Sequence, residues 1–228
     1  MKLLHEFTKS GYKIQIKLLI DHLWYNNKNN TEGGEPPEPL LSEIWHPKMT
    51  LTTRDKILST AERLIQETGN AEVTLAQIAT ALGMTHAALY KHFKNKQALW
   101  EAVATAWFQR EIIDQIHCAP ATLAQTQLHD WLWAFVTAKK HAYNTDPQMF
   151  ALNTRYVDNN PKALRAVLTP AYQVVSQIMD YHDPHDEKAE AILAAFAIFT
   201  LPSFRETWND ADYAQRFERI WYLIKAGV

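Results

Sequence analysis

Side chains that could recognise the edges of nucleic-acid bases lie together in the second quarter of this sequence. Lys91 and His86 carry N–H groups that can donate hydrogen bonds to guanine. Ala87 and Ala88 are small enough to contact a thymine methyl group. These residue types predict direct reading of a DNA groove. The candidate set is Thr85, His86, Ala87, Ala88, Lys91 and His92.

Short capped helices are expected to position these side chains. Thr74 begins a capping-box pattern, and Gly83 follows the end of the helix that Thr74 opens. Thr85 is placed to cap the next helix, over residues 86–93, and Asn95 to cap a further one. Two short helices joined by a glycine-containing turn predict a helix-turn-helix, whose second helix enters the major groove. Thr74 and the free N–H groups beside it are expected to hold a phosphate.

A longer amphipathic helix precedes this pair. Ile57, Ala61 and Ile65 recur at four-residue spacing after Thr53, and Gly69 marks the end of the apolar face. Together with the short pair, this helix predicts a three-helix N-terminal domain. On geometry alone, the alternative is a plain helical hairpin that never contacts nucleic acid.

The segment from Leu51 to Phe108 resembles the DNA-binding domain of the tetracycline-repressor (TetR) family. The resemblance covers about sixty residues and lies in Thr-Leu-Ala-Gln-Ile-Ala, Gly-Met-Thr and Tyr-Lys-His-Phe-Lys-Asn-Lys. It implies that Tyr90 and Lys96 grip the DNA backbone. It also implies a homodimeric repressor that a small-molecule effector releases from operator DNA. The family often has glycine or a basic residue near His86, so the operator sequence is not predicted.

Composition limits the kinds of protein that this chain can be. It has 228 residues, 47% hydrophobic and 21% charged, with a net charge of −2. Residues 48–100 carry seven Lys or Arg against four Asp or Glu, whereas residues 101–228 carry eleven against fifteen. A basic segment joined to an acidic body fits a module that meets an anion. The single cysteine, Cys118, and the lack of a membrane-length apolar run indicate a cytoplasmic protein without a membrane partner.

The spacing of apolar residues and the positions of the prolines predict an all-α fold in three parts. Apolar residues recur at three- and four-residue spacing between prolines, and strict alternation is absent. Residues 49–100 form the helix-turn-helix domain, and residues 101–228 form a helical ligand-binding and dimerisation domain. Residues 1–48, which end in a Gly/Pro/Glu-rich stretch, are expected to be a poorly ordered extension or to precede the natural start. The alternative for this extension is a basic arm that contacts DNA.

The body is expected to contain helices near residues 122–144, 146–158, 161–181, 186–201 and 210–225. Family resemblance implies an effector pocket among them, mostly apolar with a few polar groups. Ordinary core packing is the alternative for each candidate. The candidates are Trp131, Phe135, Tyr143, Phe150, Asn153, Arg155, Tyr156 and Tyr172.

A helix that is apolar almost all round is expected over residues 189–201. Such a helix must be buried on more than one side. A central helix within one chain would satisfy this requirement, but the resemblance favours a two-fold four-helix bundle formed with the last helix. The candidate dimer contacts are Phe196, Phe199, Phe217 and Trp221.

Neither metal nor catalytic chemistry is predicted. The segment 182–187 and the pair His117 and Cys118 contain ligand-type residues, but their spacing matches no zinc signature. The sequence also lacks a Gly-rich phosphate loop and a nucleophile elbow. We therefore expect no metal, no cofactor and no enzymatic activity. The alternative function is a helical protein that binds a metal or small molecule without binding DNA.

Overall fold

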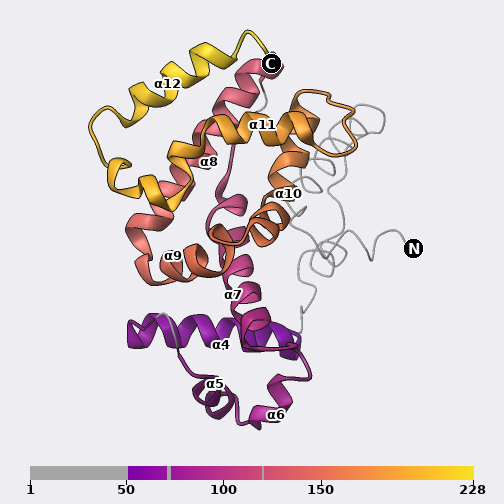
Figure 1. Cartoon of the computed structure of the whole chain (residues 1–228), viewed down its shortest axis with the longest axis vertical. Helices are drawn as coiled ribbons and strands as arrows, with labels where there is room; N and C mark the ends of the chain where they lie inside the picture. Colours follow the sequence, from indigo (N-terminus) through magenta and orange to yellow (C-terminus); the bar gives the residue numbers. More distant parts are fainter. Residues whose placement is uncertain (1–50, 71–72, 120) are drawn as a thin grey trace, which may run out of the picture. The chain divides into compact units, whose positions relative to one another are not determined.

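The computed structural model describes residues 51–70, 73–119 and 121–228, of which 52–228 form one compact unit (Figure 1). This part of the chain contains helices and no strand, which confirms the all-α prediction. The expectations for residues 1–48 lie outside the described residues. The α-helices are α4 (Thr53–Thr68), α5 (Leu75–Ala81), α6 (His86–Leu89), α7 (Lys96–Glu111), α8 (Ala124–Thr145), α9 (Pro147–Asn153), α10 (Pro161–Ile178), α11 (Glu187–Ala195) and α12 (Tyr213–Ile224).

The predicted caps fix the starts of the short helices. Thr74, Thr85 and Asn95 each accept a hydrogen bond from a backbone N–H three residues later, at 3.2, 3.3 and 2.8 Å. These bonds satisfy N–H groups that have no partner within the helix. After α5, Gly83 takes the left-handed conformation, with φ of 62°. A residue with a Cβ adopts this conformation at a cost, so the turn favours glycine.

The second helix of the motif is shorter than the spacing predicted. The α-helix ends at Leu89, whereas the sequence indicated residues 86–93. The N–H groups of Lys91 and His92 bond to carbonyls three residues earlier, at 3.3 and 3.0 Å. A hydrogen bond to the carbonyl three residues earlier winds the backbone more tightly than an α-helix does. The chain therefore leaves the α-helix after Leu89, but Phe93 is still buried.

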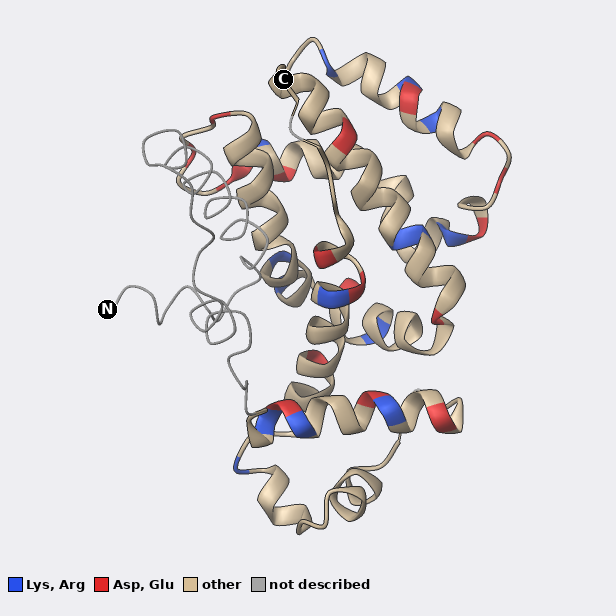
Figure 2. Cartoon of the chain, turned by 180° about the vertical axis from the view of Figure 1, so that it is seen from behind, with Lys and Arg blue, Asp and Glu red and all other residues tan. Residues whose placement is uncertain are grey.

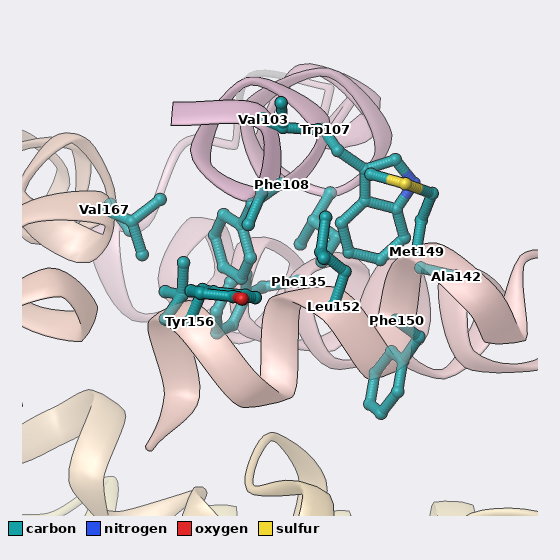
Figure 3. Packing of buried hydrophobic residues seen from close by; sticks show 14 of the residues in the cluster. Val103, Trp107, Phe108, Phe135, Ala142, Met149, Phe150, Leu152, Tyr156 and Val167 are labelled. Carbon is teal, nitrogen blue, oxygen red and sulfur yellow. The ribbon is translucent and has the colours of Figure 1, made fainter. Parts of the chain in front are cut away.

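Helix α7 connects the helix-turn-helix to the body. Its residues Leu99 and Trp100 are buried near the start, and Trp107 and Phe108 are buried near the end. In Figure 3, Trp107 lies beside Met149, while Phe108 is directed toward the aromatic rings of the body. The expected boundary between residues 100 and 101 lies inside α7. The two parts therefore share one helix.

The helix expected over residues 186–201 is interrupted. It ends at Ala195 and is followed by 3-10 turns over Ala197–Phe199 and Pro202–Thr207. Pro202 lacks an N–H and restricts the residue before it, which is extended. The rings of Phe196 and Phe199 in this segment pack on Phe217 of α12. In the described part of the chain, no helix has the length and apolar character needed to span a membrane.

Candidate functional site

The predicted DNA-contacting side chains lie on one part of the fold and are open to solvent. Thr74 is exposed at the start of α5. Among the candidates, only Ala88 is half-buried rather than exposed. Tyr90 is 45% exposed although it is a large aromatic residue. The exposed residues of the candidate set around α6 and α7 are Thr85, His86, Ala87, Tyr90, Lys91, His92 and Lys96.

The charge on this surface has one sign. Between Val73 and Trp100 the chain carries three lysines, Lys91, Lys94 and Lys96, and no Asp or Glu. Figure 2 shows no acidic residue on α5 or α6, whereas acids and bases are interleaved on α4. Lys94 was not among the sequence candidates, although it is exposed and lies between two that were. Such a surface suits the phosphates of DNA.

Contacts within the helix-turn-helix hold residues 86–93, the recognition segment, in place. The rings of His86 and Tyr90 meet edge to face, with centroids 5.3 Å apart. The guanidinium of Arg54 lies 4.4 Å from the Phe93 ring centroid, and its Nη1 donates to the His92 carbonyl at 3.4 Å. Arg54 thus ties α4 to the end of the recognition segment. Sequence analysis missed it, because no local pattern relates residues so far apart.

The body contains a cavity of about 210 Å³ among α7, α8, α10 and α11. Phe135 and Tyr172 are the predicted pocket residues that line it. The other lining residues are Phe108, Lys139, Asp158, Leu164, Leu168, Glu190, Leu193, Ala194, Ala197, Thr200 and Leu201. The wall is therefore apolar apart from a few polar groups, as ligand pockets generally are.

A buried ion pair forms part of this wall. Lys139 Nζ lies 3.1 Å from Asp158 Oδ1, and each side chain is 2% exposed. Asn153 Nδ2 donates to Asp158 Oδ2 at 2.9 Å. A π-helical turn, Thr154–Asp158, follows α9 and ends at this carboxylate. Such turns occur often at functional sites, because they re-aim side chains within a helix.

Sequence analysis could have found Lys139 from its position. Lys139 lies four residues after Phe135 and three before Ala142, both buried on the same face of α8. A lysine on an apolar helix face is unusual unless its charge is paired. For Asp158, by contrast, the π-helical turn decides its direction, and that turn has no clear sequence pattern.

Most other predicted pocket residues belong to the packed core. Trp131 stacks on Phe135 with centroids 5.5 Å apart. Tyr143 and Phe150 meet the ring of Trp208 at 5.7 and 5.8 Å. Trp131, Tyr143 and Phe150 do not line the cavity.

The remaining pocket candidates follow the same pattern. Tyr156 is buried, with its ring 6.5 Å from that of Trp100. Arg155 is exposed and lies over the Tyr156 ring. Asn153 reaches the cavity only through Asp158. The pocket is thus smaller than the predicted set of aromatic residues implied.

The predicted dimer contacts require correction. Phe196, Phe199 and Phe217 are 0–1% exposed within a single chain. Phe217 meets Phe196 and Phe199 at centroid distances of 4.9 and 6.0 Å. These three rings form the intramolecular core between the interrupted helix and α12, so they offer no surface to a partner. Trp221 is half-buried beside His129.

His129 joins α8 to α12 through charged hydrogen bonds. Its Nδ1 lies 2.9 Å from an Asp130 oxygen, and its Nε2 lies 3.0 Å from Glu218. Burial alone lowers the pKa of His129, but the hydrogen bonds to the two carboxylates outweigh burial and raise the pKa above its ordinary value. Protonated His129 therefore favours the docking of α12.

This raised pKa predicts how stability depends on pH. The stabilisation from His129 is complete below the unfolded-state pKa of about 6.5 and is lost as the pH rises through the higher folded-state pKa. As the pH rises above about 6.5, the free energy of unfolding should fall more steeply in the unaltered protein than in His129→Gln. Urea denaturation across this range measures both slopes, and parallel slopes would contradict the prediction.

Asp146 links the two parts of the compact unit. Its Oδ2 accepts hydrogen bonds from Gln66 Nε2 on α4 at 3.2 Å and from Trp107 Nε1 on α7 at 3.3 Å. Its Oδ1 accepts the backbone N–H of Met149 at 3.2 Å and so caps α9. Arg110 on α7 also pairs with Glu62 on α4. A displacement of α7 or α9 therefore changes the contacts that position α4.

The histidine- and aspartate-containing segments do not assemble into a metal centre in the part of the chain that is described. No group of three or more His, Cys, Asp or Glu residues is placed there to hold an ion. Asp183, within the loop between α10 and α11, accepts backbone N–H bonds from His185 and Lys188 at 3.0 Å. This aspartate therefore orders the loop.

Comparisons with known proteins agree with the fold. Residues 57–103 match the sequence model of the family described as "Bacterial regulatory proteins, tetR family", and residues 124–221 match "Tetracyclin repressor-like, C-terminal domain". The fold also resembles a crystal structure of BioQ with its natural double-stranded DNA operator, with a TM-score of 0.52 and 16% identity. That similarity covers 77% of this chain and 99% of BioQ.

Curated relatives match only part of this chain. Tetracycline repressor protein class C from Escherichia coli is 36% identical over 72 residues, which are 32% of this chain and 32% of that protein. The regulator TtgR from Pseudomonas putida is 45% identical over 51 residues, 22% of this chain and 24% of TtgR. The chain thus spans about a third or less of the curated relatives it matches.

Proposed function

Because the chain belongs to the TetR family of bacterial regulatory proteins, we propose that it is a DNA-binding transcriptional regulator that represses from an operator. The observation that carries this proposal is the exposed surface around α6, with three lysines and no acid. A regulator of this kind acts in the cytoplasm, where bacterial DNA lies. Regulators of this family are generally not enzymes, and we propose no catalytic activity.

Each exposed residue has a role in this proposal. Lys91 and His86 donate to bases in the major groove, with Thr85, Ala87 and His92 around them. Tyr90 and Lys96 contact the DNA backbone, and Thr74 presents the start of α5 to a phosphate. Ala88 is half-buried and so adds less to base contact than the sequence implied.

The decisive experiment is a genome-wide footprint of the purified protein on the fragmented DNA of its own organism. We expect protection of a few sites with two related halves, because paired recognition helices read half-sites about one turn apart or more. Uniform, sequence-independent protection, or none at all, would contradict the proposal.

Lys96→Ala should weaken binding to all DNA sequences alike. Loss of one phosphate contact should flatten the slope of log affinity against log salt by about one per half-site. Salt titrations by fluorescence anisotropy measure this slope. Lys162→Ala is the matched control, because Lys162 is an exposed lysine on α10. Equal slopes for the two variants would remove Lys96 from the interface.

We propose further that a small-molecule effector occupies the cavity beside Lys139 and lowers operator affinity. Helix α7 carries both Phe108, which lies in the cavity wall, and Lys96, which lies at the start of α7 close in sequence to α6. The contacts of Asp146 and Arg110 join this helix to α4. A ligand that moves α7 would therefore change the position of the helix-turn-helix. Operator and effector would each weaken binding of the other.

We also propose a homodimer formed by the outer face of α12. Tyr222 and Leu223 are 69% and 77% exposed and line a groove with Glu218 and Arg219. A second copy of the chain would cover these two exposed apolar side chains. Neighbouring charges of opposite sign allow reciprocal ion pairs across a two-fold axis. This face replaces the buried rings that the sequence indicated.

Leu223→Glu should dissociate this dimer without unfolding the chain. The side chain is exposed in one chain, so the charge remains solvated in a monomer but would be buried in the interface. Sedimentation velocity measures the fraction of dimer. Leu51→Glu places the same charge at another exposed leucine and should leave the dimer intact. An unchanged dimer fraction in Leu223→Glu would rule out this face.

A further inference from the structure

We propose that the cavity beside Lys139 takes an uncharged molecule about the size of one aromatic ring that carries a hydrogen-bond acceptor. This inference rests on the proposed effector role of the cavity and specifies the chemistry of the effector. The cavity volume is about 210 Å³. Benzene fills a cavity of roughly 150 Å³, whereas sites for drug-sized ligands measure roughly 300–1,000 Å³. The volume therefore favours a single ring with a short substituent.

Two hydrogen-bond donors of the wall have capacity to spare. Lys139 has three N–H groups, and within the described residues its hydrogen bonds go only to Asp158, at 3.1 and 3.4 Å. Tyr172 lines the same cavity, and its hydroxyl makes no hydrogen bond to any residue that the structure describes. Each of these donors can bind an acceptor atom on a ligand.

The buried carboxylate of the wall is already engaged. Asp158 accepts from Lys139 and from Asn153. Lys139 still has an N–H group that its bonds to Asp158 do not use, so the wall favours a ligand with an acceptor such as a carbonyl or ether oxygen.

The charges around the cavity are balanced in pairs. Asp158 neutralises Lys139, and Glu190 pairs with Arg165 at the outer side of the wall. A ligand anion would meet Asp158 and Glu190, and a ligand cation would meet Lys139. Either charge would be buried without a free partner, which costs more than burying a neutral group. An uncharged ligand avoids this cost.

The test uses four planar probes of nearly the same shape. Acetophenone is neutral and has a carbonyl acceptor, α-methylstyrene is neutral and lacks an acceptor, benzoate is an anion, and benzamidine is a cation. Calorimetry on the full chain without DNA measures the Kd of each. We expect the Kd of acetophenone to be at least about tenfold lower than the Kd of each other probe, because a hydrogen bond to a charged donor contributes about this much to affinity.

Several results would overturn the inference. Benzoate or benzamidine binding as tightly as acetophenone would refute an uncharged ligand, and equal binding of α-methylstyrene would refute the acceptor. If none of the four probes binds, the cavity is not a ring-sized site. Each of these outcomes concerns the cavity alone, since no operator is present.

A pair of variants locates the binding. Tyr172→Phe removes a donor from the wall and should weaken acetophenone binding by roughly three- to tenfold without changing binding of α-methylstyrene. Tyr143→Phe makes the same change outside the cavity and should leave both affinities unaltered. Equal effects of the two variants on acetophenone would place the ligand elsewhere and overturn the proposal.

A separate measurement distinguishes this inference from the proposed function. Operator release by acetophenone is followed by fluorescence anisotropy on the sites found by footprinting. If acetophenone binds with the expected preference but does not release the operator, the ligand class stands and the effector role fails. If the chain binds no DNA, the calorimetric result is still interpretable by itself.

Discussion

Lys139→Met is expected to lower the free energy of unfolding by about 3–5 kcal/mol, because it leaves the buried carboxylate of Asp158 without its partner. Lys139 also lies 4.9 Å from the Phe108 ring centroid and 5.4 Å from that of Phe150, so its cation–π contacts are lost as well. Urea denaturation with a two-state analysis measures the change.

Two further variants make this prediction specific to the ion pair. Lys140→Met alters the next residue of α8, which is half-buried and lies over the Tyr213 ring, and should cost no more than about 1 kcal/mol. The double variant Lys139→Met with Asp158→Asn removes both charges, keeps an acceptor for Asn153 and should recover most of the lost stability. A double variant as unstable as the single one would show that shape rather than charge pairing decides this site.

Phe196→Glu is expected to unfold the chain rather than only to dissociate a dimer. Phe196 is 1% exposed and packs on Phe217 at 4.9 Å. Removing a buried phenyl ring costs about 3–5 kcal/mol, and burying a carboxylate adds to this. The sum is comparable to the stability of a typical domain, about 5–15 kcal/mol.

Phe204→Glu provides the matched control for this variant. Phe204 lies in the 3-10 turn Pro202–Thr207 and is 40% exposed, so the same change should cost about 1 kcal/mol or less. Circular dichroism during thermal unfolding compares the two. A folded monomer of Phe196→Glu would contradict the burial of this ring and restore it as a dimer contact.

The helix-turn-helix could be predicted from the sequence because its determinants are local. The caps at Thr74, Thr85 and Asn95 bond to N–H groups only three residues away. Gly83 provides the left-handed turn by its lack of a Cβ. Side chains of a short surface helix must face either the core or solvent, so the spacing around α6 also indicated the exposed set. Only Ala88 and the end of the helix differ.

Tertiary structure alone decided the cavity and the burial of the rings that the sequence assigned to a dimer interface. Lys139 and Asp158 lie on different helical segments, and a π-helical turn brings the carboxylate to the amine. Phe196 and Phe199 face inward because the helix predicted for residues 186–201 is interrupted at its middle. Periodicity reports that a residue is apolar and lies on a given face, but not which element covers that face. Distant segments make that choice when they compete to bury the same rings and pair the same charges.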